Sequence, residues 1–258
     1  MTDDQPYIRF VHVSKAFGSQ PVLDDVSFEV RRGEMAVVLG RSGVGKSVTL
    51  KHLMGFLRPD SGEVWVAGRE VSCLPELELL DLRRHLTMVF QSGALFDSLT
   101  LAENVAYPIR ERAVHDEVTL DEDQVQARVD ELLGLVDLPL DARDLAPSDL
   151  STGMKRAVAI ARALAAKPEC LLYDEPTTMV DPLMAATIGD LILKLKRRTG
   201  LTSVVVTHDM KLARKLADRV VFLVDGKVAF FGPIGELSAC EVPMVQAFIY
   251  LDEMPTLA

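Results

Sequence analysis

The chain contains 258 residues, of which 48% are hydrophobic and 26% are charged, so it is long enough to bury a sizeable core. Its formal net charge of −10 at pH 7 argues against a nucleic-acid partner, because nucleic-acid-binding surfaces are rich in basic residues. We therefore expect one large α/β domain that carries an insertion.

The cysteines and the first residues indicate the compartment. Cys73, Cys170 and Cys240 lie far apart without metal-ligand spacing, which favours free thiols in a reducing environment. Met1–Asp4 is acidic and lacks the basic and apolar regions of a signal peptide. No stretch approaches the roughly 18 consecutive apolar residues of a membrane span. We expect a chain that stays where it is made and reaches a membrane only through a partner.

Two strands are predicted at the start of the chain. Tyr7–Val13 alternates apolar and polar residues, and Val22–Val30 contains a second extended stretch. Between them, Phe17 precedes a glycine turn. Two interpretations of Phe17 stay open, a core aromatic or a ring that stacks on a purine, a contact worth about 1–3 kcal/mol. We favour stacking.

A glycine-rich loop follows the apolar run Met35–Leu39, and a helical pattern begins near Lys46. Glycines let successive backbone N–H groups curl around phosphates, and the helix N-terminus favours an anion. Lys46 adds a point charge, and the Ser47 hydroxyl is a candidate Mg²⁺ ligand. A turn with a chance lysine is the alternative, but the full spacing favours nucleotide binding. The residues expected to hold the nucleotide here are Gly40, Arg41, Ser42, Gly43, Val44, Gly45, Lys46, Ser47 and Val48.

Helices and strands alternate after the loop. The expected segments are a helix around Leu50–Leu57, a strand at Glu63–Val66, a helix over Leu77–Arg84 and a strand at Thr87–Phe90 that ends at Gln91. From Gln91 to about Leu164 the pattern is mainly helical, with an amphipathic helix at Val125–Val136 and an acidic loop at His115–Asp123. This region is predicted to be a helical insertion.

Strand patterns return in the last third of the chain. Cys170–Tyr173 and Ser203–Thr207 are nearly continuous apolar runs, as in strands buried on both faces of a parallel sheet. The remaining expected elements are a helix over Pro182–Arg198, a hairpin of Val220–Val224 and Lys227–Phe231 with a type I′ turn at Asp225–Gly226, and an apolar helical stretch, Val245–Leu251, that is a candidate for docking on a neighbour.

Two acidic residues, Asp174 and Glu175, follow directly on the predicted strand Leu171–Tyr173. At the carboxyl end of a strand in an α/β sheet, such side chains can meet a metal and a water. Asp174 is a candidate Mg²⁺ ligand, and Glu175 is a candidate to orient or deprotonate the attacking water. The alternative, a surface acidic pair before a turn, is less favoured once the phosphate loop is considered.

These motifs resemble those of ABC-transporter ATPases in order and approximate spacing. They are the phosphate loop, Gln91, Leu150–Met154, Leu171–Pro176, Val180–Asp181 and Thr207–Asp209, and the resemblance covers the chain from Tyr7 to about Gly235. The resemblance implies that Gln91 links nucleotide to a transmembrane partner and ligates Mg²⁺, that His208 contacts the γ-phosphate, and that Asp181 lines a dimer interface. It also implies that Ser151 and Gly153 act on the ATP of a second subunit.

The fold implied by this resemblance is α/β, an ABC-type P-loop NTPase. It has a RecA-like, mostly parallel sheet core, an N-terminal antiparallel β subdomain and an inserted helical subdomain. The corresponding division is an ATPase core over residues 1–91 and 165–237, a helical signature subdomain over 92–164 and a tail over 238–258. The chain has one phosphate loop and one signature, so each site needs a second copy of the chain or a homologue. A homodimer that sandwiches two ATP molecules is expected.

A closer resemblance lies in Phe90–Phe96, in Asn104–Pro108 and in Met154, where most ABC signatures end in glutamine. These features are similar to the ATPase of the bacterial Mla lipid-asymmetry system and its relatives, the MCE-associated lipid importers and plastid TGD systems. The resemblance implies phospholipid transport with an MlaE-like permease and an MCE-domain, MlaD-like protein, with room for a STAS-domain, MlaB-like subunit. It also implies a peripheral position on the cytoplasmic face of the bacterial inner membrane.

Departures and alternatives remain. Thr152 replaces the usual signature glycine, and its Cβ narrows the backbone's choices. Met179 replaces a residue that is usually small. A P-loop GTPase is excluded in its ordinary form, because the sole asparagine, Asn104, is followed by valine rather than by the lysine of a guanine-reading motif. The alternatives kept are an importer ATPase for another small solute and a non-transport ABC regulator.

Overall fold

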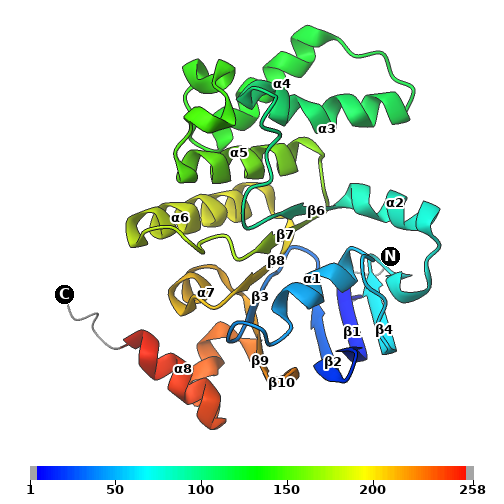
Figure 1. Ribbon diagram of the computed structural model, residues 1–258, viewed down its shortest axis with the longest axis vertical. Coiled ribbons are helices and arrows are strands. Elements are labelled where there is room, and N and C mark those ends of the chain that lie inside the picture. Colours follow the sequence, from blue (N-terminus) through cyan, green and yellow to red (C-terminus); the bar gives the residue numbers. More distant parts are fainter. Residues whose placement is uncertain (1–4, 254–258) are drawn as a thin grey trace. The chain divides into compact units, whose positions relative to one another are not determined.

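The structure is a computed structural model that describes residues 5–253, so the predicted ends at 1–4 and 254–258 lie outside the described residues. The chain forms two compact units (Figure 1). The first unit takes in the chain up to Arg83 and again from Gly200 onward, and the second unit runs from Arg84 to Thr199. Helix α2 (Glu76–His85) contains the point at which the chain passes from the first unit to the second.

An antiparallel sheet in the first unit has the strand order β2-β1-β4-β5. Its strands are β1 (Ile8–Phe17), β2 (Gln20–Val30), β4 (Ser61–Val66) and β5 (Arg69–Glu70). Alternate side chains of β1 and β2 are buried, and the rings of Phe10 and Phe28 stack with their centroids 4.5 Å apart. The predicted strands are confirmed, but β1 extends to Phe17 rather than ending near Val13.

Four more strands of the first unit lie in the order β10-β9-β3-β8. They are β3 (Met35–Leu39), β8 (Thr202–Thr207), β9 (Arg219–Val224) and β10 (Lys227–Pro233). Strand β3 pairs in parallel with β8 and β9, and every residue of β3 and β8 is buried, as the apolar runs predict. Positive φ angles at Asp225 (47°) and Gly226 (78°) confirm the type I′ hairpin turn.

The helices contained in the first unit are α1 (Lys46–Leu53), α7 (Met210–Leu216) and α8 (Pro243–Glu253), with 3₁₀ turns η1 (Val71–Cys73) and η4 (Ile234–Ala239). The apolar face of α8 packs within this unit, because Val245 and Ile249 are buried and Phe248 meets Phe222 of β9 edge-on at 5.2 Å. Part of the stretch considered for docking on a neighbour therefore packs within this unit, whereas Tyr250 and Leu251 are exposed.

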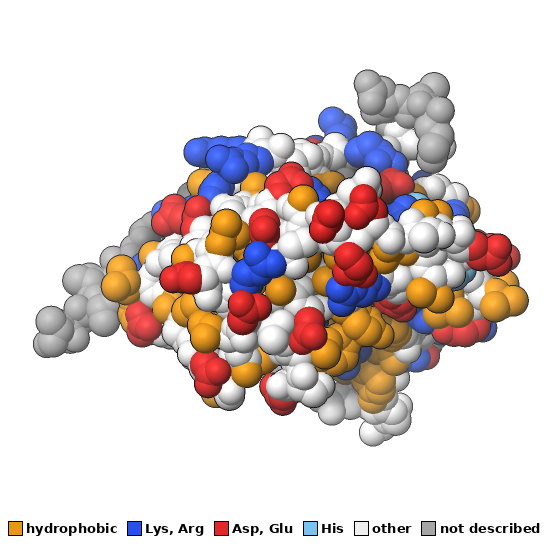
Figure 2. Space-filling model, turned by 90° about the horizontal axis from the view of Figure 1, so that it is seen from above, with side chains coloured by type: hydrophobic (Ala, Val, Ile, Leu, Met, Phe, Trp, Pro, Cys, Tyr) orange, Lys and Arg blue, Asp and Glu red, His pale blue; other side chains and the backbone are white. Residues whose placement is uncertain are grey.

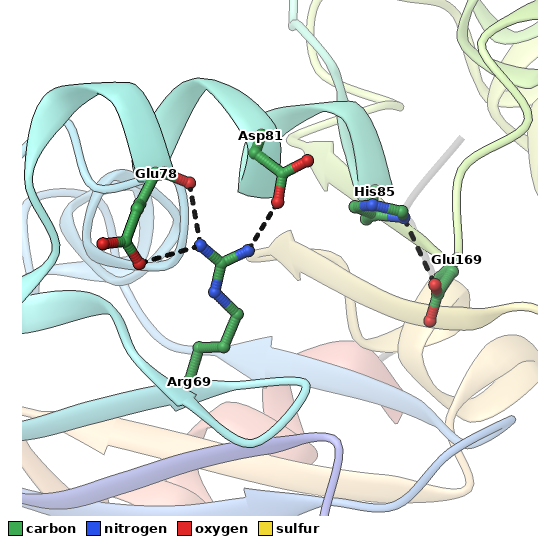
Figure 3. Close-up of polar contacts among 5 residues, drawn as sticks. All are labelled: Arg69, Glu78, Asp81, His85 and Glu169. Carbon is green, nitrogen blue, oxygen red and sulfur yellow. Dashed lines mark hydrogen bonds and ion pairs between the residues drawn. The ribbon is translucent and has the colours of Figure 1, made fainter.

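A single guanidinium ties β5 to α2 in the first unit. Arg69 lies 2.7 Å from a carboxylate oxygen of Asp81 and 3.3 Å from one of Glu78, and it also donates to the Glu78 carbonyl (Figure 3). Both acids lie on the same face of α2. Because the three side chains are partly exposed, we assign this cluster about 1 kcal/mol or less per ion pair.

The second unit contains a parallel strand pair and helices. Its elements are β6 (Leu86–Val89), β7 (Cys170–Asp174), α3 (Leu101–His115), α4 (Glu122–Leu135), α5 (Thr152–Ala165) and α6 (Pro182–Thr199), with 3₁₀ turns η2 (Leu140–Asp144) and η3 (Pro147–Asp149). The start of β7 is held beside β6, since Glu169 donates from its backbone to the His85 carbonyl at 2.8 Å and pairs with the His85 ring at 3.2 Å (Figure 3).

Local sequence signals explain where these helices begin. Thr100 and Glu103 form a reciprocal capping box at the start of α3, and Asp121 caps α4. The apolar positions of α4 from Val125 to Leu133 are buried, so the predicted amphipathic helix is confirmed. The segment between α3 and α4 is the predicted acidic loop.

The charge pattern of the surface is relevant to a nucleic-acid partner, and the length and apolar character of the helices are relevant to a membrane. Figure 2 shows a face on which acidic and basic side chains are interspersed, with no broad basic area. Among residues 5–253, none of the helices combines the length and apolar character needed to cross a bilayer.

Candidate functional site

The phosphate loop of the first unit links the end of β3 to the start of α1. Gly40, Gly43 and Gly45 have φ angles of 151°, 86° and 104°, a region that strongly favours glycine. A Cβ on Gly40 would lie 2.6 Å from the Leu223 carbonyl oxygen, and one on Gly45 would lie 2.8 Å from the Val22 carbonyl oxygen. Space around Gly43 is open. Two glycines therefore permit close packing, and the third shapes an accessible turn.

Lys46 lies inside the curl of this loop. Its side chain is only 5% exposed, and Nζ donates to the carbonyls of Gly40 at 2.9 Å and Arg41 at 3.1 Å. Ser47 follows in the first turn of α1, which contains no acidic residue. A helix N-terminus, a curled glycine backbone and a held ammonium together suit an oxyanion.

His208 shares an edge of the sheet with this loop. Leu39 of β3 is the parallel partner of Thr207 of β8, and Gly40 and His208 are the residues that follow them. Asp209 then begins α7, accepting from the Leu212 backbone N–H at 3.0 Å. The structure thus brings the exposed His208 to the strand edge from which the phosphate loop starts.

In the second unit, Gln91 and the two acids share the carboxyl edge of the strand pair. Val89 of β6 is opposite Tyr173 of β7, so Gln91 and Glu175 each follow two residues later. Asp174 is the last residue of β7. Glu175 has a φ of 46°, an unfavourable conformation for a residue with a side chain, and the Thr178 hydroxyl donates to its carboxylate at 3.0 Å.

The signature segment forms the start of α5. The Ser151 hydroxyl oxygen accepts from the Met154 backbone N–H at 3.2 Å and so caps the helix. Gly153 is in close contact with Met184 of α6, which leaves no room for a Cβ without movement of that side chain. Thr152 is helical with an ordinary negative φ, so its Cβ introduces no strain here.

Asp181 begins α6. Its carboxylate accepts from the Met184 backbone N–H at 3.0 Å, which is a helix-capping contact. The nearby Met179 has a backbone φ of 61°, which is unfavourable for a residue with a Cβ, and its side chain is 88% exposed.

Three residues for which the sequence predicted no supporting role hold the segment around Gln91. Arg156 donates to the Phe90 carbonyl at 3.2 Å, and Arg162 donates to the Gly93 carbonyl at 3.0 Å. Asn104 is fully buried and bonds to the backbone of Phe96 at 2.9 and 3.1 Å. Burial lowers the pKa of both guanidinium groups. The sequence feature that could have revealed these three residues is a polar side chain on the apolar face of α3 or α5.

His52 on α1 makes folding stability depend on pH. It is 1% exposed, its Nδ1 lies 2.9 Å from the Leu57 carbonyl oxygen, and its Nε2 has no hydrogen-bond partner. Burial is the main cause that lowers the pKa of His52 from 6.5, and the nearby Lys15 adds to it. Just below pH 6.5, His52 therefore binds a proton in the unfolded chain but remains neutral in the folded chain.

We expect the free energy of unfolding to fall as the pH drops from 6.5 toward the lowered pKa of His52, and this contribution to be fully present above pH 6.5. Urea unfolding at a series of pH values from 7.5 to 5, for the wild type and for His52→Gln, measures this. A glutamine amide can still donate to Leu57 but does not titrate. Equal pH slopes for the two proteins would contradict the assignment.

A strand, a glycine loop with a lysine and a helix define a P-loop nucleotide-binding protein. Residues 23–178 match the family described as "ABC transporter". The chain belongs to this family, whose ATP-binding cassettes are ATPases. The predicted α/β cassette fold, with its antiparallel N-terminal sheet and its helices, is confirmed.

Two relatives have names that describe ATP-binding proteins of import or transport systems. The chain is 41% identical over 235 residues to the "Methionine import ATP-binding protein MetN" of Mesorhizobium japonicum, covering 91% of this chain and 62% of that protein. It is 35% identical over 237 residues to the "Probable ribonucleotide transport ATP-binding protein mkl" of Mycobacterium leprae, covering 92% and 67%. The chain thus spans 62% of the length of the methionine-import relative.

Solved structures agree on the fold. The dimeric ATP-binding cassette MJ0796 in a post-hydrolysis state, bound to ADP and Pi, superposes with a TM-score of 0.78 at 32% identity, covering 88% of this chain and 98% of that chain. The cassette cbiO1 of Clostridium perfringens, part of the complex cbiONQ, gives a TM-score of 0.81 at 26% identity, with 92% of each chain covered.

Proposed function

We propose that the chain binds ATP with Mg²⁺ and hydrolyses it as the ATPase subunit of a membrane transporter. The observation that carries this proposal is the phosphate loop with the Lys46 ammonium held between two of its carbonyls. The family and the dimeric cassette bound to ADP and Pi support it.

Each site residue has a proposed role. In the first unit, the loop Gly40–Val48 holds the phosphates, Phe17 stacks on the base and His208 contacts the γ-phosphate. In the second unit, Glu175 acts on the attacking water. The oxygen donors Ser47, Gln91 and Asp174 suit Mg²⁺, which prefers hard oxygen ligands and neutralises phosphate charge when bound.

A homodimer is proposed because each site needs a second subunit. Ser151 and Gly153 lie at the N-terminus of α5, whose first turn has no acidic residue and thus suits the phosphates of the partner's ATP. Asp181 is proposed to line the same interface. ATP binding closes this dimer, and hydrolysis reopens it. We also propose that the chain divides into a core at 1–91 and 165–237, a signature subdomain at 92–164 and a tail at 238–258.

Phospholipid is the proposed cargo, through an MlaE-like permease and an MCE-domain protein at the cytoplasmic face of the bacterial inner membrane, with a STAS-domain subunit as a further candidate partner. The support is the resemblance of Phe90–Phe96, Asn104–Pro108 and Met154 to Mla-type ATPases. Methionine import is the second candidate, because a protein of that name is 41% identical to the chain.

Affinity purification of the tagged chain from membranes in mild detergent separates the candidates. Mass spectrometry of the co-purified proteins and lipids is expected to find a permease and an MCE-domain protein with bound phospholipid. A permease that co-purifies with an amino-acid receptor would favour methionine import instead. A homodimer without any membrane partner would favour a regulator. An untagged strain processed in parallel identifies contaminants.

A further inference from the structure

The end of β1, which carries Phe17, pairs irregularly with its neighbour β2. The register between the two strands shifts between Val13 and Lys15 and again between Lys15 and Ala16. Ala16 is opposite Pro21, which has no N–H to donate to a strand ladder. Phe17 is the last residue of β1 before the hairpin turn. Contacts from outside the β1–β2 ladder can therefore contribute to the position of this ring.

Asp60, in the segment before β4, supplies that support. Its backbone N–H donates to the Ser14 carbonyl at 2.9 Å. One of its carboxylate oxygens accepts from the Ala16 backbone N–H at 2.7 Å, and the other accepts from Lys15 Nζ at 2.6 Å. Hydrogen bonds from Lys15 and then from Ala16 lower the pKa of Asp60, so the carboxylate stays ionised at neutral pH. Three contacts thus hold three consecutive residues of β1.

Lys15 extends this contact to the ring itself. Its side chain is only 17% exposed, and its ammonium lies over the Phe17 ring, 5.8 Å from the centroid. A cation at that distance is attracted to an aromatic face. Phe17 nevertheless remains 48% exposed, so much of the ring is accessible to a ligand. Because Asp60 holds the Lys15 ammonium, its carboxylate influences both the backbone at Ala16 and, through Lys15, one face of the Phe17 ring.

The hairpin that carries Phe17 also rests on the phosphate loop. Phe17 is paired with Gln20, and two residues further along β2 the Val22 carbonyl packs closely on Gly45, leaving no room for a Cβ there. Two residues of an extended strand span about 7 Å. The distance from the aromatic ring to the phosphate loop is thus set by one short piece of strand and by whatever fixes the end of β1.

We propose that Asp60, with Lys15, is a positioning residue for nucleotide binding that holds Phe17 where a purine base stacks. The inference rests on the proposed base-stacking role of Phe17. It predicts that Asp60 affects the recognition of the base and not the recognition of the phosphates, because its contacts are with β1 and not with the loop Gly40–Ser47.

Calorimetric titrations with Mg²⁺-ADP and with Mg²⁺-pyrophosphate test this prediction, since the second ligand lacks the base. Asp60→Asn keeps the shape of the side chain but cannot accept both hydrogen bonds. We expect its affinity for ADP to fall about 3- to 10-fold, with pyrophosphate affinity unchanged. Lys15→Met should show the same selective loss. Asp25→Asn is the matched control, because Asp25 is an exposed carboxylate of the same sheet, bonded to His12 at 2.6 Å.

Phe17→Ala separates the possible failures. It should weaken ADP binding at least as much as Asp60→Asn does, and the double variant should be no weaker than Phe17→Ala alone, because the two residues act through one contact. Equal losses of ADP and pyrophosphate affinity in Asp60→Asn would overturn the positioning role. ADP affinity unchanged in Phe17→Ala would overturn base stacking, and the inference with it, while Lys46→Ala still reports on the phosphate site.

Discussion

Glu175→Gln is expected to slow ATP hydrolysis by about 10²- to 10⁴-fold while ATP binding persists. The glutamine has nearly the same shape as the glutamate but cannot take a proton from the attacking water. Steady-state phosphate release measures turnover, and equilibrium binding of ATP is measured separately. Wild-type turnover in this variant would remove Glu175 from the proposed role.

The geometry of Glu175 supports its proposed role. Its backbone is held at a φ of 46°, in a conformation that costs free energy for any residue with a Cβ, and Thr178 donates to its carboxylate. Strain of this kind is common where a side chain must be aimed. Thr178→Val should therefore cause a smaller loss of turnover, because it removes one hydrogen-bond donor to the carboxylate and leaves the carboxylate in place.

Glu169→Gln is the matched control for this prediction. Glu169 precedes β7, whereas Glu175 follows that strand, and its carboxylate is partly exposed and paired with His85. Turnover in this variant should equal that of the wild type. If hydrolysis reopens the proposed dimer, Glu175→Gln with ATP should also elute as a dimer in gel filtration, whereas Glu169→Gln with ATP should not accumulate in that form.

Elements of the fold could be predicted where a local pattern is sufficient. The glycine spacing predicts the loop between β3 and α1, because the φ angles found at Gly43 and Gly45 strongly favour glycine. Burial on both faces of β8 is reflected in its run of three consecutive valines, Val204–Val206. These signals depend on a residue and its near neighbours in sequence, and therefore they are legible without a structure.

Contacts between distant residues could not be predicted in the same way. The strand β1 was expected to end near Val13, and it reaches Phe17, where Asp60 bonds to the backbone of Ala16 from 44 residues away in sequence. Arg162 supports the Gly93 carbonyl from 69 residues away. A single arginine in a helical pattern does not reveal which carbonyl it will meet, so such supporting residues emerge only from the fold.

Lys46→Ala is expected to weaken ATP binding by about 10- to 100-fold, the loss typical of removing hydrogen bonds from a charged group. In the structure, Nζ is held by the carbonyls of Gly40 and Arg41, so the ammonium is already placed inside the loop before any anion arrives. Titration with Mg²⁺-ATP, under conditions in which turnover is negligible, measures the change.

Lys51→Ala is the control, because Lys51 lies on the same helix but is exposed and outside the phosphate loop. Its ATP affinity should match that of the wild type. Lys46→Arg should bind poorly as well, since a planar guanidinium does not replace a compact ammonium between two carbonyls about 3 Å away. An unchanged affinity in Lys46→Ala would contradict phosphate binding at this loop, and the roles proposed for Ser47 and His208 would fail with it.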